Sequence, residues 1–321
     1  MPPARRRPIS LPSPLLRRVD ALVTAFLSPD SGPAFDFTQP AGEPALTAPD
    51  SVSWRVFKNP VALYIGGVAA VILELGEPRV RDAIWQHSDF RSAPLARLRR
   101  TGLAAMVTIY GPRSRTEAMI AGIVRRHDKV RGQTSDGISY HANDPRLLDW
   151  VQATATFGFM EAYAAFVSPL STDERNALLA EGRPSAVLYG ARGVPTGMDD
   201  LDAFLGEMAG QLEPSPIIGE FLAIMSKVKV FPGPSGPFQR RLLRAAVDIL
   251  PAPIRERLEL GKQWSLGAFD RSVVRAAARA ADRLVVPAAP AVQACRRLGL
   301  PEDYLYRTPG SDRQGSKIST K

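Results

Sequence analysis

The chain has 321 residues, 45% hydrophobic and 23% charged, which is the composition of an ordinary globular protein with enough apolar material for a large core. Its single cysteine, Cys295, excludes an internal disulfide and a zinc site built from several thiolates. The longest apolar run, residues 61–73, is shorter than the roughly 20 residues that span a bilayer. Because the basic, proline-rich start is a poor match to a cleavable signal peptide, we expect a soluble protein in the cytoplasm.

The formal net charge is +9, and one band carries most of the excess. Residues 91–132 contain ten arginines and lysines but two acidic residues, whereas residues 143–220 contain twelve acidic residues and four arginines. The basic band therefore faces the acidic segment, lies in solvent, or binds nucleic acid. We expect no nucleic-acid partner, because zinc-finger, basic-zipper and RNP patterns are absent and aromatic residues are not interleaved with the basic ones.

Three parts of different character follow one another along the chain. Residues 1–50 form an N-terminal arm in which only LLRRVDALVTAFL has helical periodicity, so the arm packs as one helix or stays mobile. Residues 51–307 are predicted to form an all-α domain, a bundle of helices separated by proline and glycine. Residues 308–321 form a polar tail that we expect to be disordered.

Within the domain, capping residues and apolar periodicity place the helices. They are expected over residues 60–74, 78–85, 94–110, 114–132 and 145–166, from 171 onward, within 196–212, and over most of 240–300. Residues 135–144 form a loop with a short extended piece, and residues 227–241 form a linker rich in proline and glycine. Gly66 and Gly67 in the first helix allow close approach of a flat ligand or of another backbone, and a helix crossing is the simpler interpretation.

Three histidines are the first candidates for chemistry. One helical stripe is formed by Ile120, Ile123, Val124, His127 and Val130. On such an apolar face His127 is either a core histidine bonded to a carbonyl or the ligand of a metal or haem iron, which binds neutral imidazole in apolar pockets. His87 is expected to cap a helix end or support a neighbouring ligand, and His141 to lie in a surface loop.

Arg97 and Thr101 in PLARLRRTG are four residues apart and project from one helix face. Basic residues here and around His127 would neutralise the two propionates of a haem whose ring lies in an apolar slot. Alternatively, the Thr101 hydroxyl bonds its own backbone, as helical threonines often do. Hydrolases, Rossmann dehydrogenases and zinc proteases are disfavoured, because the catalytic-triad order, glycine-rich nucleotide loops and HExxH are all absent.

Four motifs follow in order: GGVAAVILELGEPRVRDAIWQHSDF, PLARLRRTG, RRHDKVRG and GISYHANDPRLLDWVQATATFGFMEAYAAFVSPLSTDER. Over residues 54–300 they resemble the MpaB oxygenase/latex-clearing protein (rubber oxygenase) family. The resemblance implies a helical bundle with a globin-like core that binds haem b without a covalent link. It identifies His127 as the proximal iron ligand and places Arg97 and Thr101 in the haem pocket. Arg131, one of the basic residues around His127, is a further candidate for cofactor binding.

The same resemblance implies an enzyme that uses dioxygen to cleave carbon–carbon double bonds of isoprenoid chains. We therefore expect a haem b-dependent oxygenase acting on a small lipophilic metabolite, with Arg97 and Thr101 as catalytic residues. A different class of protein stays open, namely a non-catalytic helical module that binds haem or lipid as a sensor or carrier. The sequence does not fix the oligomeric state.

The chain departs from the family pattern at several positions. Arg100 stands where the rubber-cleaving members, which are secreted, have a lysine, and this argues against rubber itself as the substrate. Glu77 and Gln152 stand where many relatives have histidine, in the His-Pro and WVHAT motifs. Together with His87, these two residues are candidates for an acid/base role on the distal side of the haem.

Overall fold

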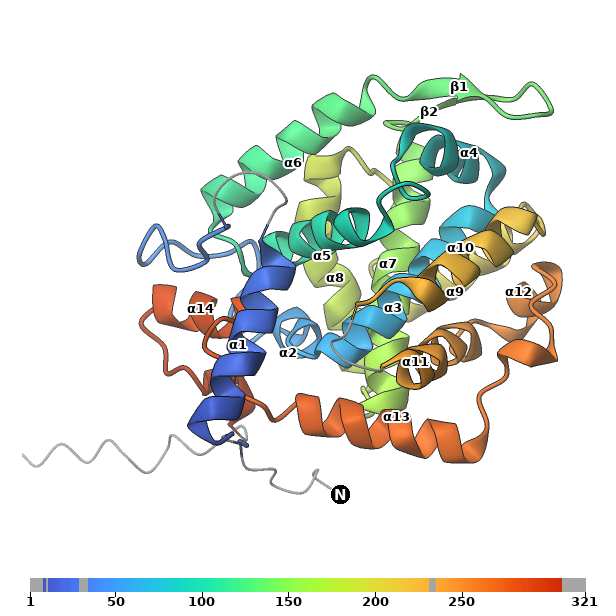
Figure 1. The fold of residues 1–321 in the computed structure, drawn as a ribbon. Helices are drawn as coiled ribbons and strands as arrows, with labels where there is room; N and C mark the ends of the chain where they lie inside the picture. The colour runs from blue at the N-terminus through green and yellow to red at the C-terminus, as the bar shows by residue number, and fades with distance from the viewer. Residues whose placement is uncertain (1–7, 10, 29–33, 231–234, 308–321) are drawn as a thin grey trace, which may run out of the picture.

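The computed structural model describes residues 8–9, 11–28, 34–230 and 235–307. These residues are mostly helical, with one small two-stranded antiparallel sheet (Figure 1), and the prediction of a helical protein is confirmed. The α-helices are α1 Ser13–Leu27, α2 Val52–Phe57, α3 Pro60–Gly76, α4 Pro78–His87, α5 Pro94–Tyr110, α6 Arg113–His127, α7 Pro145–Phe166, α8 Thr172–Tyr189, α9 Met198–Ala209, α10 Pro216–Lys227, α11 Gly236–Asp248, α12 Ala252–Arg257, α13 Ala268–Ala281 and α14 Pro290–Arg297. The strands are β1 Arg131–Gln133 and β2 Ser139–His141, and the 3₁₀ segments are η1 Lys262–Trp264 and η2 Tyr304–Tyr306.

Several helices begin where local capping chemistry predicts. The helix α7 starts after Asp144, whose carboxylate accepts the Arg146 backbone N–H at 2.8 Å. The helix α8 opens with a capping box, in which the side chains of Ser171 and Glu174 each accept the other residue's backbone N–H. Because these bonds join residues close together in the sequence, both helix starts could be predicted correctly from the sequence.

The helix expected over residues 114–132 is shorter than predicted. It begins at Arg113 and ends at His127, and the following residues enter β1, in which Arg131 is paired with His141 of β2. The short extended piece expected in the loop is β2 itself. The helix stops because the backbone of β1 finds its hydrogen-bond partners in a strand that lies later in the sequence.

The linker expected over residues 227–241 is also shorter, because α11 begins at Gly236 inside it. Pro237 lies in the first turn of α11, where a missing N–H breaks no helical bond. From there to residue 300 the chain is largely helical, as predicted, in the form of α11, α12, α13 and α14.

Part of the N-terminal arm packs on the helical body. The helix α1 is steeply inclined to α5 and meets it near one end (Figure 1), and the Asp20 carboxylate accepts the Ala288 backbone N–H at 2.6 Å. Phe37 is fully buried, and its carbonyl accepts a hydrogen bond from the Arg297 guanidinium at 2.7 Å. The helix predicted in the arm is therefore docked, whereas the predicted tail over residues 308–321 lies outside the described residues.

Two long helices, α3 and α7, cross at the centre of the structure (Figure 1). A Cβ atom on Gly158 would lie 2.3 Å from the Gly66 carbonyl oxygen, and one on Gly66 would lie 2.7 Å from the Gly158 backbone. The two backbones are therefore in contact, and only hydrogen fits at either position. The predicted helix crossing at Gly66 is confirmed.

The crossing places α3 deep in the core, which explains its apolar sequence. Most of its residues are buried, and α4, α10, α11 and α13 pack around it. Of the helices that the structure describes, none is by itself long and apolar enough to cross a membrane; α3 and α4, bent by 110°, meet that length and composition test only as a pair.

Replacing Gly158 by alanine tests the crossing. We expect Gly158→Ala to lower the free energy of unfolding by about 1–3 kcal/mol, because the new methyl group would overlap the Gly66 carbonyl. Gly206→Ala in α9 is the matched control: nothing lies within 4 Å of its added Cβ, so it should be neutral or stabilise by up to about 1 kcal/mol. Urea unfolding measures both variants, and equal stabilities would contradict the close crossing.

Candidate functional site at the open end of the α5–α6 hairpin

The helices α5 and α6 form a hairpin that diverges from its turn towards α4 and β1 (Figure 1). The turn needs glycine, because a Cβ on Gly111 would lie 2.5 Å from the Val107 carbonyl oxygen. The buried Thr116 hydroxyl donates to that same oxygen at 2.9 Å and ties the start of α6 to the end of α5. Arg97 in the first turn of α5 and His127 in the last turn of α6 thus lie at the same end of the hairpin.

His127 is partly buried, and its Nδ1 atom is buried without a hydrogen-bond partner among the described residues. Burial lowers the pKa of the imidazole, and the charge of Arg97 lowers it further. At neutral pH the ring is therefore uncharged and keeps one nitrogen lone pair for a ligand bond. The carbonyl bond that a purely structural core histidine would make at Nδ1 is not observed in the described part of the chain.

Arg97 is partly buried next to this imidazole. Burial lowers the pKa of its guanidinium, and the negative charges of Glu74 and Asp89 oppose that change. Within the described chain, no hydrogen bond or ion pair shorter than 4 Å engages the guanidinium. Because arginine stays protonated, the site contains a cation without a direct counter-ion, which is suited to bidentate binding of a carboxylate.

Glu74, near the end of α3, is a site residue that the sequence analysis missed. Burial raises the pKa of its carboxyl to about 7, against the opposing effects of the Arg97 charge and of a hydrogen bond with Thr154. Thr154 lies in α7 and is fully buried, and its single hydroxyl proton is shared between the Glu74 carboxyl and the Val151 carbonyl, which lies 2.9 Å from the hydroxyl oxygen. A carboxyl with this pKa can hold or release a proton at neutral pH.

Thr101 and Arg131 are more exposed than the other predicted cofactor-binding residues. The Thr101 hydroxyl donates to the Arg97 carbonyl one turn earlier at 3.0 Å, which is the backbone bond considered as the alternative from the sequence. Arg131 is 65% exposed and lies 3.3 Å from the Asp128 carboxylate. Their roles in cofactor binding stay predictions.

Glu77 and His87, considered as distal acid/base candidates, both make structural contacts. Glu77 is 2% exposed and caps α4: its carboxylate accepts the Val80 backbone N–H at 2.7 Å and the Arg79 Nε–H at 2.7 Å. His87 ends α4, and its Nε2 lies 3.1 Å from the Tyr140 hydroxyl. Both side chains help to fix α4, and their catalytic role stays a prediction.

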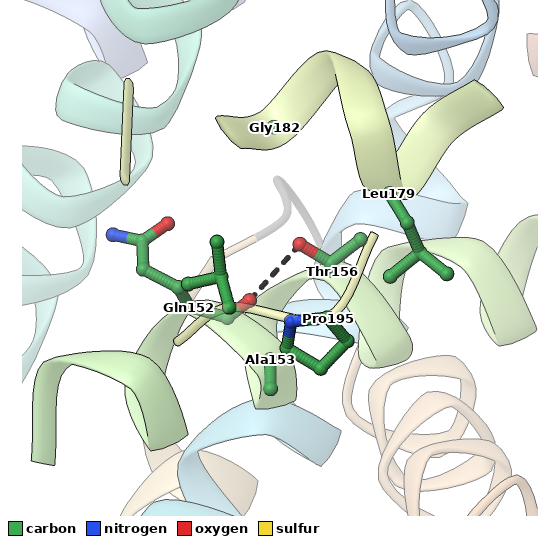
Figure 2. A pocket seen from close by; sticks show the side chains of 7 residues that line it. Gln152, Ala153, Thr156, Leu179, Gly182 and Pro195 are labelled. Atoms are coloured by element: carbon green, nitrogen blue, oxygen red, sulfur yellow. Dashed lines mark hydrogen bonds between the residues drawn. The ribbon is translucent and has the colours of Figure 1, made fainter. Parts of the chain in front are cut away.

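Gln152 lines a small pocket between α7 and α8, together with Thr156, whose hydroxyl donates to the Gln152 carbonyl at 2.9 Å (Figure 2). The pocket has a volume of about 10 Å³, which suits one water molecule and not a lipophilic substrate. Gln152 is therefore on the face of α7 towards α8, whereas Thr154, two residues later, meets Glu74 of α3.

Part of the basic band is balanced inside the molecule. Arg91 pairs with Glu220 of the acidic segment at 3.0 Å, and Arg100 pairs with Asp89 at 2.5 Å. The expectation that the band faces the acidic segment is thus confirmed for Arg91, while Arg100 finds its partner locally. These exposed pairs contribute little to stability.

The residues at the open end of the hairpin fit a flat, apolar, acidic ligand. The helix α5 has no fully buried residue before Met106, and α6 has none after Ile120. Leu98 of α5 and Ile123 and Val124 of α6 are only partly buried, so each keeps some exposed apolar surface. An uncharged imidazole can bind a haem iron, a nearby arginine can bind a propionate, and partly exposed apolar side chains can contact the ring.

A metal bound by protein side chains alone does not fit this place. No group of three or more His, Cys, Asp or Glu side chains that could hold a metal ion occurs in the ranges that the structure describes. An iron at His127 would therefore need most of its ligands from a prosthetic group, and a porphyrin supplies four nitrogens.

Residues 54–283 match the family described as "ER-bound oxygenase mpaB/B'/Rubber oxygenase, catalytic domain". Two proteins described as uncharacterized, Mb2261 of Mycobacterium bovis and Rv2237 of Mycobacterium tuberculosis, are each 27% identical over 229 residues, covering 68% of this chain and 88% of the relative. No solved structure matches. Residues 97, 101, 127 and 131 all lie within the matched range.

Glu74→Gln tests the buried carboxyl. Its folded pKa of about 7 lies above the ordinary 4.5, so the proton is bound more tightly in the folded state and stability is lost as pH rises from 4.5 through 7. Relative to wild type, the Glu74→Gln variant should therefore gain up to about 3 kcal/mol in its free energy of unfolding between pH 5 and pH 8. Urea unfolding at both pH values measures the gain, with the exposed Glu117→Gln as control. A difference from wild type that does not change with pH would refute the buried-carboxyl assignment.

Proposed function

Because the chain belongs to the MpaB/rubber oxygenase catalytic-domain family, whose members are described as oxygenases, we propose that it is a haem b-dependent oxygenase acting with dioxygen on a small lipophilic substrate. The observation that carries the haem assignment is the partly buried, uncharged imidazole of His127, with the Arg97 charge close enough to lower its pKa. A globin-like arrangement around the haem, an isoprenoid-like substrate and a cytoplasmic location belong to the same proposal.

The chain's own residues suggest how the group would be held. His127 would bind the iron and stay neutral, because burial and the nearby Arg97 charge lower its pKa. Arg97 would bind a propionate, with Thr101 and Arg131 as further cofactor contacts. The partly covered apolar side chains of α5 and α6 would contact the ring. When bound, a haem supplies the binding and activation of dioxygen.

The other residues act on protons and water. The Glu74 carboxyl, with a pKa of about 7, can give up or accept a proton at neutral pH. The Arg97 charge favours its ionised form, and the Thr154 contact restrains its orientation. Glu74 is itself partly buried, and the buried apolar residues of α3 and α7 reduce the contact of its side chain with water.

His127→Ala tests the cofactor. After reconstitution with haem, wild-type protein should show a Soret band in its visible spectrum, and the variant should lose the band or shift it strongly. His141→Ala is the matched control, because His141 lies in β2, contacts Asp128 at 3.3 Å, and is not assigned to the iron. Equal spectra for all three proteins would remove His127 from the cofactor site, and a wild type that cannot hold haem would end the proposal.

A second measurement separates an oxygenase from a haem or lipid carrier. The oxygenase consumes dioxygen when supplied with an isoprenoid alkene, and Glu74→Gln should slow that consumption while leaving the Soret band in place. A carrier would hold haem or lipid without consuming dioxygen with any alkene.

A further inference from the structure

The last turn of α6 is tied to the loop that precedes α7. The Val124 carbonyl accepts the Asp128 backbone N–H at 3.0 Å and the Asn143 side-chain Nδ2–H at 3.1 Å. Val124 is three residues before His127, so Asn143 is attached to the helix turn that carries the imidazole. This contact brings the Asn143 side chain to the helix turn that contains the candidate iron ligand.

The hydrogen bond to Val124 fixes the orientation of the Asn143 amide. Its nitrogen must face the carbonyl, because the reversed amide would put two acceptor oxygens against each other. The remaining atom, Oδ1, is therefore an acceptor, and it is buried without a hydrogen-bond partner among the described residues. A buried acceptor without a donor is unfavourable, so this oxygen calls for a nearby N–H or O–H group.

His127 Nδ1 is a possible donor that lacks an acceptor. It too is buried and lacks a partner in the described part of the chain. In the tautomer with a proton on Nδ1, this atom is the donor that Asn143 Oδ1 lacks, and Nε2 keeps its lone pair. The nearby carboxylate of Asp128 is a weaker competitor, since it is 63% exposed and already contacts Arg131 and His141, each at 3.3 Å.

We propose that Asn143 is the positioning residue of His127: its Oδ1 accepts the Nδ1–H proton and selects the tautomer in which Nε2 is free to bind a metal ion. Histidines that bind metals generally donate the other ring N–H to an acceptor, which orients the ring and tunes its basicity. The link to iron rests on the proposed function, whereas the selection of the tautomer does not.

The test is the tautomer of His127 in the full chain, read from ¹⁵N–¹H correlation spectra of histidine-labelled protein at neutral pH before and after haem is added. Two variants form a matched pair: Asn143→Asp and Asn143→Ala both lose the Nδ2–H bond to Val124, but only aspartate keeps an acceptor oxygen. We expect the Nδ1–H form in wild type and in Asn143→Asp, and a shift towards Nε2–H in Asn143→Ala.

A wild-type ring found as Nε2–H would overturn the inference without any variant, and so would an Asn143→Ala spectrum equal to that of wild type. If Asn143→Asp and Asn143→Ala change the His127 tautomer to the same extent, Asn143 only caps α6, and the inference is also wrong. If the wild-type ring is the Nδ1–H tautomer but the protein cannot hold haem, the inference stands and the proposed function is wrong. If the ring is the Nε2–H tautomer and the protein holds haem, the inference is wrong and the proposed function stands.

Discussion

The contact between the backbones of α3 and α7 at Gly66 and Gly158 is the constraint on which the arrangement of the other helices depends. It sets the distance and the register between the two central helices. Glu74 is about two turns along α3 from the crossing, and Thr154 is about one turn back along α7, which is why these residues meet. A larger side chain at the crossing would move apart the helices that form this contact.

Burial is distributed unevenly around this crossing. The central pair and the helices packed on it, α4, α10, α11 and α13, contain most of the apolar core. The open end of the α5–α6 hairpin is different, because its apolar side chains are partly exposed. The Arg97 guanidinium is near the Glu74 carboxyl of α3 but forms no direct ion pair with it. A well-packed core thus supports a hairpin whose side chains are less completely buried, and ligand sites commonly lie at such places.

Local chemistry made much of the fold predictable. Caps such as Asp144 and Ser171 located helix starts, because they bond to backbone N–H groups only two or three residues away. The crossing at Gly66 was predictable as a close approach, but its partner Gly158 lies far along the sequence and was not identified. The end of α6 was missed because residues 128–131 contain no helix breaker, and the helix stops through pairing with β2.

The candidate site was predictable to a similar extent. The apolar stripe and the family resemblance both pointed to His127, and the structure places Arg97 near it. The pairing of Glu74 with Thr154 could not be derived, since it depends on the helix crossing, although a lone carboxyl in the apolar α3 sequence was an available signal. Glu77 was considered for catalysis, yet it caps α4, and its position before Pro78 is the local pattern of a helix start.

The most direct measurement is a crystal structure of the haem-loaded protein in which anomalous scattering locates the iron. The account predicts an iron coordinated by His127 Nε2, with the porphyrin at the open end of the α5–α6 hairpin and a propionate at Arg97. An iron bound by His87 or His141, or a porphyrin that contacts neither helix of the hairpin, would contradict it.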